Sequence, residues 1–317
     1  MRALVTGGSG FAGGHLVEHL RACGDEVVTV SRSGDLAADL LDPQATARAV
    51  AEATPDVVYH LAAQAHVGRS WADPAATLND NLAMTLNVLG AVRSAVPEAT
   101  VVAVSSGEVY GPPATLPVDE HAELRPQNPY AVSKASADLL ARFHADAYGM
   151  RVVRPRAFNH AGPRQEPAYA IASFARQVAL GAAAGEDPVV VETGNPDTRR
   201  DYTDVRDVVR AYRLLALHGE PGEAYNVCSG RTASAAELVA ACAAVAGVRI
   251  DHRVDRSLVR AHEVMEIRGS FEKLRAATGW EPEIDLETTL RDTMAWWREQ
   301  AAASQPGGDT LAGAGPE

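Results

Sequence analysis

Short apolar runs that alternate with stretches of helical spacing constrain the fold of this chain more than any other feature. The runs are continuous rather than alternating with polar residues, as expected of strands covered on both faces: Ala3–Val5, Val27–Val30, Val57–Leu61, Thr100–Val104 and Arg151–Val153. The helical stretches between them are Phe11–Cys23, Pro43–Ala53, Pro74–Ser94 and Tyr130–Tyr148. This order predicts right-handed strand-helix-strand crossovers and therefore a doubly wound parallel α/β sheet.

A glycine-rich turn lies between the first run and the first helical stretch. Gly7, Gly10 and Gly13 stand there in the spacing GxxGxxG, with Phe11 and Ala12 between the last two. Glycine permits a positive φ and lets a pyrophosphate approach the backbone at the N-terminus of the next helix. A glycine-rich turn alone is often only a turn, but between a strand and a helix it predicts a Rossmann-type dinucleotide site.

The residues after the second run bear on which dinucleotide binds. Ser31-Arg32-Ser33 offers no carboxylate for a free ribose 2'-hydroxyl, whereas Arg32 can clamp a 2'-phosphate. NADP(H) is therefore favoured and NAD(H) stays open, since Arg32 also fits an ordinary surface arginine. Asp39 and Leu40 are candidates for the adenine edge, although a loop Asp is commonly a turn former.

The second half of the chain is punctuated by Pro and Gly, with helical patterns at 171–180, 204–218, 233–246 and 286–301. Another apolar run, Ala224–Cys228, resembles a further strand of the same sheet. We therefore expect a cofactor domain at 1–157, rejoined by 203–228. A smaller C-terminal substrate lobe should comprise 158–202 and 229–301, and 302–317 should form a disordered tail.

A candidate catalytic group begins at the helical stretch that starts near residue 130. Tyr130 and Lys134 are four residues apart, so they share one face of a helix. A nearby ammonium, together with an oxidised nicotinamide ring, should lower the phenol pKa and allow proton exchange. Ser106 follows the run Thr100–Val104, at the carboxyl end of the sheet, where it can polarise a reacting carbonyl. Each element alone has a structural explanation, but their combination with the glycine turn is specific.

In combination, these residues make the chain resemble the extended short-chain dehydrogenase/reductases of the NAD-dependent epimerase/dehydratase family, which act on nucleotide sugars. The resemblance runs from Thr6 to about Trp297 and includes His60–Ala63, Asn81, Arg156–Asn159, Arg200–Tyr202 and 260–263. It implies that Ser106, Tyr130 and Lys134 are catalytic. It also implies cofactor contacts from Leu61, Ala62, Ala63, Asn81, Tyr130 and Lys134, and substrate contacts from Ser106, Asn159, Arg200, Arg260 and Glu263. Glu263 either holds the nucleotide ribose or pairs with Arg260.

Within that family the chain is most similar to reductases of GDP-4-keto-6-deoxy-mannose, through 125–129, 158–160, 200–207 and 225–230. The resemblance implies reduction of a C4 ketone by NADPH, with Tyr130 as proton donor. A GDP-mannose 4,6-dehydratase, a lyase, is the first alternative because Glu108 could act as the base at C5. Family dehydratases place that glutamate after Ser or Asp, whereas Gly107 precedes it here. A 4-epimerase and a catalytically silent nucleotide-binding regulator are further alternatives.

The composition of the chain excludes several classes of binding partner. The net charge of -12, from 29 Lys+Arg against 41 Asp+Glu, repels nucleic acid and anionic membranes, although converging arginines can still bind an anionic sugar nucleotide. No stretch is apolar enough to span a bilayer. Cys23, Cys228 and Cys242 lack paired spacing, and the ten histidines are scattered, so we expect a cytoplasmic protein without a metal site. The family resemblance also implies a homodimer that packs through Pro74–Ser94 and Tyr130–Tyr148.

Overall fold

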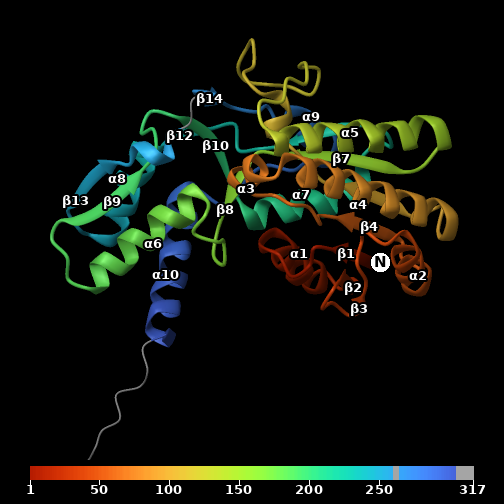
Figure 1. Ribbon diagram of the computed structural model, residues 1–317, viewed down its shortest axis with the longest axis horizontal. Helices are drawn as coiled ribbons and strands as arrows, with labels where there is room; N and C mark the ends of the chain where they lie inside the picture. Colours follow the sequence, from red (N-terminus) through yellow and green to blue (C-terminus); the bar gives the residue numbers. More distant parts are fainter. Residues whose placement is uncertain (260–263, 305–317) are drawn as a thin grey trace, which may run out of the picture.

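The computed structural model describes residues 1–259 and 264–304 (Figure 1). Its larger part is built on one sheet with the strand order β11-β7-β5-β4-β1-β2-β3, with β6 beside β7, and every pairing in it is parallel. The strands are β1 (Arg2–Thr6), β2 (Glu26–Ser31), β3 (Leu36–Ala37), β4 (Val57–His60), β5 (Thr100–Ala103), β6 (Ser105–Ser106), β7 (Val152–Ala157) and β11 (Ala224–Val227). The order reverses between β1 and β4, where ligands of such sheets bind outside the carboxyl ends.

Helices cover both faces of this sheet, which confirms the predicted doubly wound Rossmann-type α/β fold. Leu4 and Val5 of β1 belong to different apolar clusters, because neighbouring strand residues point to opposite faces. This explains why the runs are continuous. One face carries α1 (Phe11–Ala22) and α7 (Val205–His218), and the other carries α2 (Pro43–Ala53), α4 (Pro74–Ala95) and α5 (Pro129–Tyr148). Short helices α3 (Val67–Ala72) and η1 (Gly107–Tyr110) follow β4 and β6.

The smaller part of the molecule has its own apolar cluster and short strands (Figure 1, left). The strand β10 (Arg199–Asp204) pairs with β8 (Asn159–Ala161), β12 (Thr232–Ser234) and β14 (Glu266–Ile267). A second pair consists of β9 (Val189–Thr193) and β13 (Ile250–Val254), flanked by α6 (Ala170–Ala183), α8 (Ala235–Ala246), η2 (Arg256–Leu258) and α10 (Leu286–Ser304). Short polar strands such as β10 gave no clear pattern in the sequence.

The chain passes between the two parts several times. β11 and α7 pack into the large body, while α9 (Glu272–Thr278) also packs there, with Leu274 and Trp280 in the same cluster as Val5. The exact domain boundaries stay a prediction, but this packing places part of the 229–301 segment with the large sheet.

The α10 helix continues through Ser304, into the stretch expected to be disordered. The remaining tail, 305–317, and the predicted ligands Arg260 and Glu263 lie outside the described residues. In the described ranges no helix combines the length and apolar content needed to cross a membrane.

Candidate active site

The glycine turn forms a cradle of the shape that a pyrophosphate requires. Gly7 has φ +73°, and a Cβ on Gly13 would lie 2.0 Å from the carbonyl oxygen of Gly7. Gly10 is the N-cap of α1 and has no side chain to bond the first amides of that helix. The three glycines therefore keep side chains out of the place where backbone N–H groups can bind an anion. The turn fits the nicotinamide dinucleotide that the sequence predicts.

The segment after β4 packs directly on this turn. The amide of Ala62 donates to the hydroxyl of Thr6 at 3.2 Å, and a Cβ on Gly7 would lie 2.9 Å from the nitrogen of Ala62. Leu61 and Ala63 are half-buried beside it. Asn81 reaches this segment from α4, accepting from the amide of Gln64 at 2.7 Å and donating to Ser133 of α5 at 2.8 Å. Asn81 thus ties the predicted cofactor segment to the helix that carries Tyr130 and Lys134.

The other predicted cofactor residues lie in three different environments. Arg32 is exposed just beyond β2, the strand beside β1, and no ion pair involves it in the described parts of the chain. The carboxylate of Asp39 accepts from the amide of Leu41 at 3.0 Å, as a turn former does. Leu40 is buried in the core. The cofactor roles of Arg32, Asp39 and Leu40 stay predictions.

Phe11, and with it the N-terminus of α1, is held by β8 and the loop that follows it. The Phe11 ring stacks on His160 with centroids 5.9 Å apart and an interplanar angle of 8°. Further along α1, His15 contacts the carbonyl of Pro163 at 3.0 Å, and Glu18 accepts from Arg164 at 2.8 Å. Ala12 is half-buried next to Phe11. Because this segment continues from Asn159, these contacts connect the helix after the glycine turn with a predicted substrate residue.

Ser106, Tyr130 and Lys134 come together at the carboxyl edge of the sheet. Ser106 ends β6, and its side chain interacts with the phenol of Tyr130. Tyr130 stands in the first turn of α5, which begins with Pro129 after the N-cap Asn128, whose side chain accepts from the amide of Ala131 at 2.8 Å. Lys134, one turn further on, donates from Nζ to the carbonyl of Val104 at 2.5 Å. The structure therefore assembles the predicted catalytic group.

Burial dominates the electrostatics of this group. It raises the pKa of Tyr130, and the neighbouring Ser106 only partly opposes this rise. The predicted lowering requires Lys134 together with an oxidised nicotinamide ring and stays a prediction, and the ammonium of Lys134 is bonded to the carbonyl of Val104. Burial also lowers the pKa of Lys134 to about 8. The phenol of Tyr130 therefore keeps its proton at neutral pH, and burial makes it a weaker acid than a free tyrosine.

Glu108 lies close to Tyr130 and is held in place by a hydrogen bond. Its carboxylate accepts from the side-chain amide of Asn128 at 3.2 Å, and its charge contributes to raising the pKa of Tyr130. The preceding Gly107 packs against the ring of Phe158, where an added Cβ would lie 2.9 Å from the ring. Position 107 therefore carries no acid, and the neighbouring space is filled by an aromatic ring.

The smaller part of the molecule brings further polar groups to the same edge. Asn159 and Arg200 are half-buried on β8 and β10, and the guanidinium of Arg200 bonds to the carbonyl of Arg199 at 2.9 Å. Tyr202, on the same strand, interacts with Arg200 and Glu108, and burial raises its pKa to about 12. Tyr169, at the start of α6, interacts electrostatically with Tyr130. The sequence analysis gave neither tyrosine a role. Tyr202 stands in the quoted Arg200–Tyr202 motif, whereas no sequence signal singles out Tyr169.

Asp201, between Arg200 and Tyr202, has a structural role. Its buried carboxylate accepts from the amides of Ser229, Gly230 and Gly269 and from the hydroxyl of Ser229, at 2.7 to 3.2 Å. Burial raises the pKa of Asp201. These bonds fix β10 to the loop after β11, so they hold Arg200 and Tyr202 toward the large sheet.

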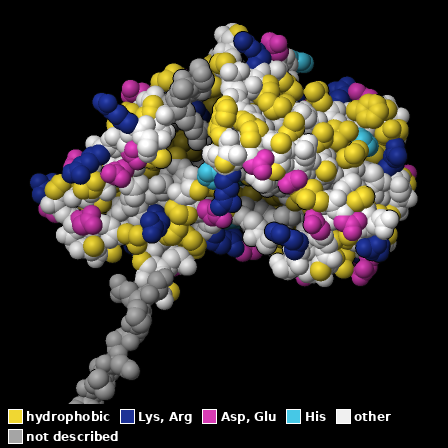
Figure 2. All heavy atoms as spheres, in the orientation of Figure 1, with side chains coloured by type: hydrophobic (Ala, Val, Ile, Leu, Met, Phe, Trp, Pro, Cys, Tyr) yellow, Lys and Arg dark blue, Asp and Glu magenta, His cyan; other side chains and the backbone are white. Residues whose placement is uncertain are grey.

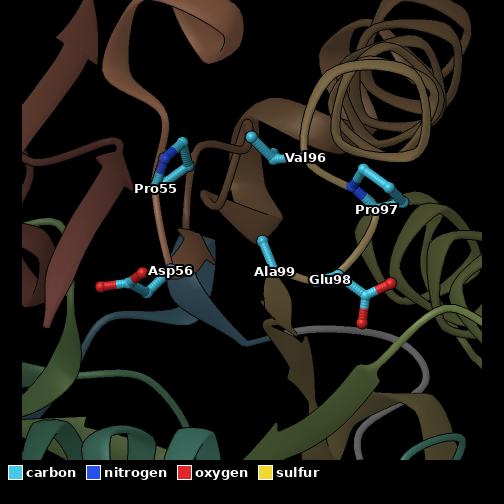
Figure 3. A pocket seen from close by; sticks show the side chains of 6 residues that line it. All are labelled: Pro55, Asp56, Val96, Pro97, Glu98 and Ala99. Atoms are coloured by element: carbon cyan, nitrogen blue, oxygen red, sulfur yellow. The ribbon is translucent and has the colours of Figure 1, made fainter.

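A surface hollow lies at the opposite edge of the sheet (Figure 3). It is lined by residues at the amino ends of β4 and β5, and its two carboxylates, Asp56 and Glu98, point away from each other. Asp56 accepts from the amide of Arg2 at 2.7 Å, so it anchors the start of β1. The hollow has none of the groups assembled around Tyr130, and we place the candidate site at the carboxyl edge.

Comparisons with known proteins agree with this geometry. Residues 35–293 match the family model described as GDP-mannose 4,6 dehydratase. The chain is 40% identical over 301 residues to the GDP-6-deoxy-D-mannose reductase of Pseudomonas aeruginosa, covering 94% of this chain and 98% of that protein. It is 30% identical over 321 residues to a UDP-glucose 4-epimerase of Mycolicibacterium smegmatis, covering 95% of this chain and 100% of the relative.

Solved structures give the same result. The structure of RMD from Pseudomonas aeruginosa complexed with NADPH superposes with a TM-score of 0.87 at 39% identity, covering 95% of this chain and 100% of that one. The UDP-glucose 4-epimerase of Thermus thermophilus, in complex with NAD, superposes with a TM-score of 0.82 at 33% identity, covering 94% of this chain and 99% of that one.

Proposed function

The chain belongs to the GDP-mannose 4,6-dehydratase family of nucleotide-sugar enzymes, and we propose that within it the chain is an NADPH-dependent reductase of a GDP-4-keto-6-deoxyhexose. The observation that carries this proposal is the 40% identity with a GDP-6-deoxy-D-mannose reductase along nearly the whole of both chains. The placement of Tyr130 supports it, since its phenol lies near Ser106 and one helical turn before Lys134, where a substrate oxygen can take its proton.

Each residue of the assembled group has a part in such a reduction. NADPH, bound on the glycine turn, supplies the hydride. Ser106 donates a hydrogen bond to the C4 carbonyl oxygen and polarises it, and Tyr130 gives its proton to that oxygen. Lys134 holds positive charge beneath the tyrosine and reaches the cofactor ribose. Asn159 and Arg200 bind the diphosphate, for which an amide and a guanidinium are suitable donors.

Dehydration is the second candidate, because Glu108 is positioned near Tyr130. A dehydratase needs a base at C5 and an acid for the departing C6 hydroxyl. Glu108 could be the base, but Gly107 supplies no acid beside it and Phe158 fills the adjoining space. A 4-epimerase would need only Ser106, Tyr130 and Lys134 and a cavity in which the keto sugar can rotate. Net reduction is therefore the better explanation of the residues present.

The decisive experiment follows NADPH absorbance with the purified chain and a GDP-4-keto-6-deoxyhexose. We expect stoichiometric oxidation of NADPH, and no oxidation would refute the reductase. In parallel, GDP-mannose is incubated without added reductant and keto products are sought. A keto product that disappears in Glu108→Gln would establish the dehydratase instead.

Arg32→Ala should weaken NADPH binding while leaving NADH binding unchanged, because only NADPH carries the 2'-phosphate.

We further propose that the enzyme is a cytoplasmic homodimer joined through α4 and α5. Figure 2 shows hydrophobic side chains gathered over these two helices, and Leu86, Leu139, Phe143 and Tyr148 are exposed there. Large exposed apolar patches mark interaction surfaces. Light scattering should give a dimer mass, and Leu139→Glu should reduce it to that of a monomer. A monomeric native chain would refute this assembly.

A further inference from the structure

The inner face of α5 carries a buried carboxylate that the proposed reaction does not use. Tyr130, Lys134 and Asp138 follow one another at intervals of four residues, so they lie along one side of the helix. Asp138 is 2% exposed and Lys134 is 7% exposed. An aspartate buried to this degree is rare unless cations or hydrogen bonds compensate its charge.

Two arginines of the neighbouring strand fix this carboxylate. Arg154 and Arg156 alternate along β7 and therefore point to the same face of the sheet. Arg156 donates from Nε and Nη2 to the two oxygens of Asp138, each at 3.0 Å, and Arg154 bonds to one of them through Nη1. Burial alone would raise the pKa of Asp138, but Arg156 and Arg154 outweigh it and lower the pKa. Asp138 is therefore ionised.

The arginines are themselves anchored, so the carboxylate cannot move freely. Arg154 donates from Nη2 to the carbonyl of Gly222 at 2.8 Å, and Arg156 donates from Nη1 to the hydroxyl of Tyr110 at 2.9 Å. Tyr110 in turn donates to the side chain of Asn226 on β11 at 2.7 Å. A chain of hydrogen bonds thus connects α5 with β7, β11 and the helix η1 that follows Ser106.

Among the described residues, the other titratable groups packed around Lys134 do not carry a negative charge as Asp138 does. His60 of β4 is buried between the hydroxyls of Thr6 and Thr85, and burial together with Lys134 lowers its pKa to about 3, so it is neutral. The pKa values of Tyr130 and of Tyr110 on η1 are raised by burial, and both phenols keep their protons. The remaining groups on β7 are the two arginines, which are positive.

Resting on the proposed function, we propose that Asp138 is a positioning residue of this site, whose fixed negative charge, one helical turn from Lys134 on α5, favours the protonated form of that ammonium behind Tyr130. Two further carboxylates of η1 and the following loop have other partners, since Glu108 accepts from Asn128 and Glu120 accepts from the amide of Asn226. Arg154 and Arg156 have a second effect, because they weaken the field of Asp138. Burial therefore disfavours the ammonium of Lys134, and the charge of Asp138, weakened by its two arginines, opposes that effect.

The sequence permits a direct measurement, since Lys134 and Lys273 are its only lysines. With lysine labelled at the ε carbon, NMR gives two side-chain signals whose titrations report two pKa values. Lys273 pairs with Glu223 at 2.6 Å on the surface and serves as the internal reference, and Lys273→Arg assigns its signal. No turnover is required, so this measurement stands even if the chain reduces a different sugar.

Two variants should shift the Lys134 titration in opposite directions. Asp138→Asn removes the negative charge, so the pKa of Lys134 should fall from about 8 by on the order of one pH unit. Arg154→Met removes a competing cation and leaves Arg156 on Asp138, so the pKa should rise. If Asp138→Asn does not fold because two arginines lose their partner, the Arg154→Met result decides alone.

Asp25→Asn is the matched control. Asp25 is also a buried carboxylate that neutralises two cations, the N-terminal amine at 3.0 Å and Arg213 at 2.7 Å, but it lies at the start of β2, on the opposite edge of the sheet. It should destabilise the chain without moving Lys134. Where turnover is measured, the alkaline limit of kcat should move to lower pH in Asp138→Asn only, because the ammonium is lost as pH rises through the pKa of Lys134. An unchanged Lys134 titration in a folded Asp138→Asn or Arg154→Met protein would overturn the proposal.

Discussion

The large sheet and the smaller part of the molecule hold their functional groups in different ways. In the large sheet Lys134 is buried and bonded to Val104, and the carboxylate of Asp138 is fixed by two arginines. In the smaller part Arg200 is half-buried and its guanidinium bonds only to the adjacent carbonyl of Arg199 among the described contacts. Its strand is held instead through its neighbour Asp201.

This difference separates two tasks. Proton and hydride transfer need groups fixed before the substrate arrives, because misplacement by a fraction of an ångström slows the reaction. Binding of a diphosphate needs cations that can still form bonds to the ligand. Changes in the large sheet should therefore affect turnover or cofactor binding, whereas changes in the smaller part should affect substrate affinity.

The largest effect is expected for Tyr130→Phe. Removing the proton donor should lower kcat by on the order of 10²-fold or more while cofactor affinity stays nearly unchanged. Single-turnover kinetics and fluorescence titration with NADPH measure the two quantities. Activity close to that of the native chain would show that another group supplies the proton.

The next largest effect is expected from two glycine substitutions, one in each part of the molecule, which should differ in their effect on NADPH affinity. In Gly13→Ala the new methyl collides with the carbonyl of Gly7, at a cost of about 1–3 kcal/mol, so NADPH affinity should fall roughly tenfold or more. Gly247→Ala, at a φ of +69° after α8 with no atom within 4 Å, should cost about 1 kcal/mol of stability and leave NADPH binding unchanged. Calorimetric titration and thermal unfolding distinguish these outcomes, and equal NADPH affinities in both variants would contradict the role of the turn.

Arg200→Ala should raise the KM for the nucleotide sugar roughly tenfold with little change in kcat, because a charged hydrogen bond contributes about 1.5–3 kcal/mol. The control is Arg249→Ala, an exposed arginine of the same part that pairs with Asp187 at 2.8 Å. Steady-state kinetics on both variants provide the test. A fall in kcat alone would move Arg200 from binding to catalysis.

The smallest effect is expected from helix caps. Ser234 caps α8 in a reciprocal capping box with Glu237. It also ends the strand β12, where it lies opposite Arg199, the neighbour of Arg200 on β10. Ser234→Ala should cost about 1 kcal/mol of stability and raise the substrate KM roughly twofold. Asp42→Ala at the cap of α2 should cost about as much without any change in KM. Identical KM values in the two variants would show that Arg200 does not depend on this support.

Prediction from the sequence succeeded where local pattern and function coincide. The continuous apolar runs gave the parallel strands, since each is buried on both faces. The turn at Gly7 and the spacing from Tyr130 to Lys134 gave the candidate site. The direction of the Lys134 ammonium could not be predicted, because it depends on an acceptor far away in the sequence, here Val104. Tyr169 and Tyr202 were missed because their approach to Tyr130 and Glu108 arises only when β10 and α6 fold against the sheet.

The sequence by itself determined the doubly wound sheet, the glycine turn and the candidate catalytic side chains, because strand burial, positive φ and helical spacing are properties of neighbouring residues. Only the tertiary structure decided the charge around those side chains. Asp138 meets Arg154 and Arg156 because α5 lies over β7. Phe158 meets Gly107 because each follows the end of its strand, where Ala157 of β7 pairs with Ser106 of β6. Electrostatic energies depend on distance and burial in space. They therefore follow from packing and cannot be read from the order of residues.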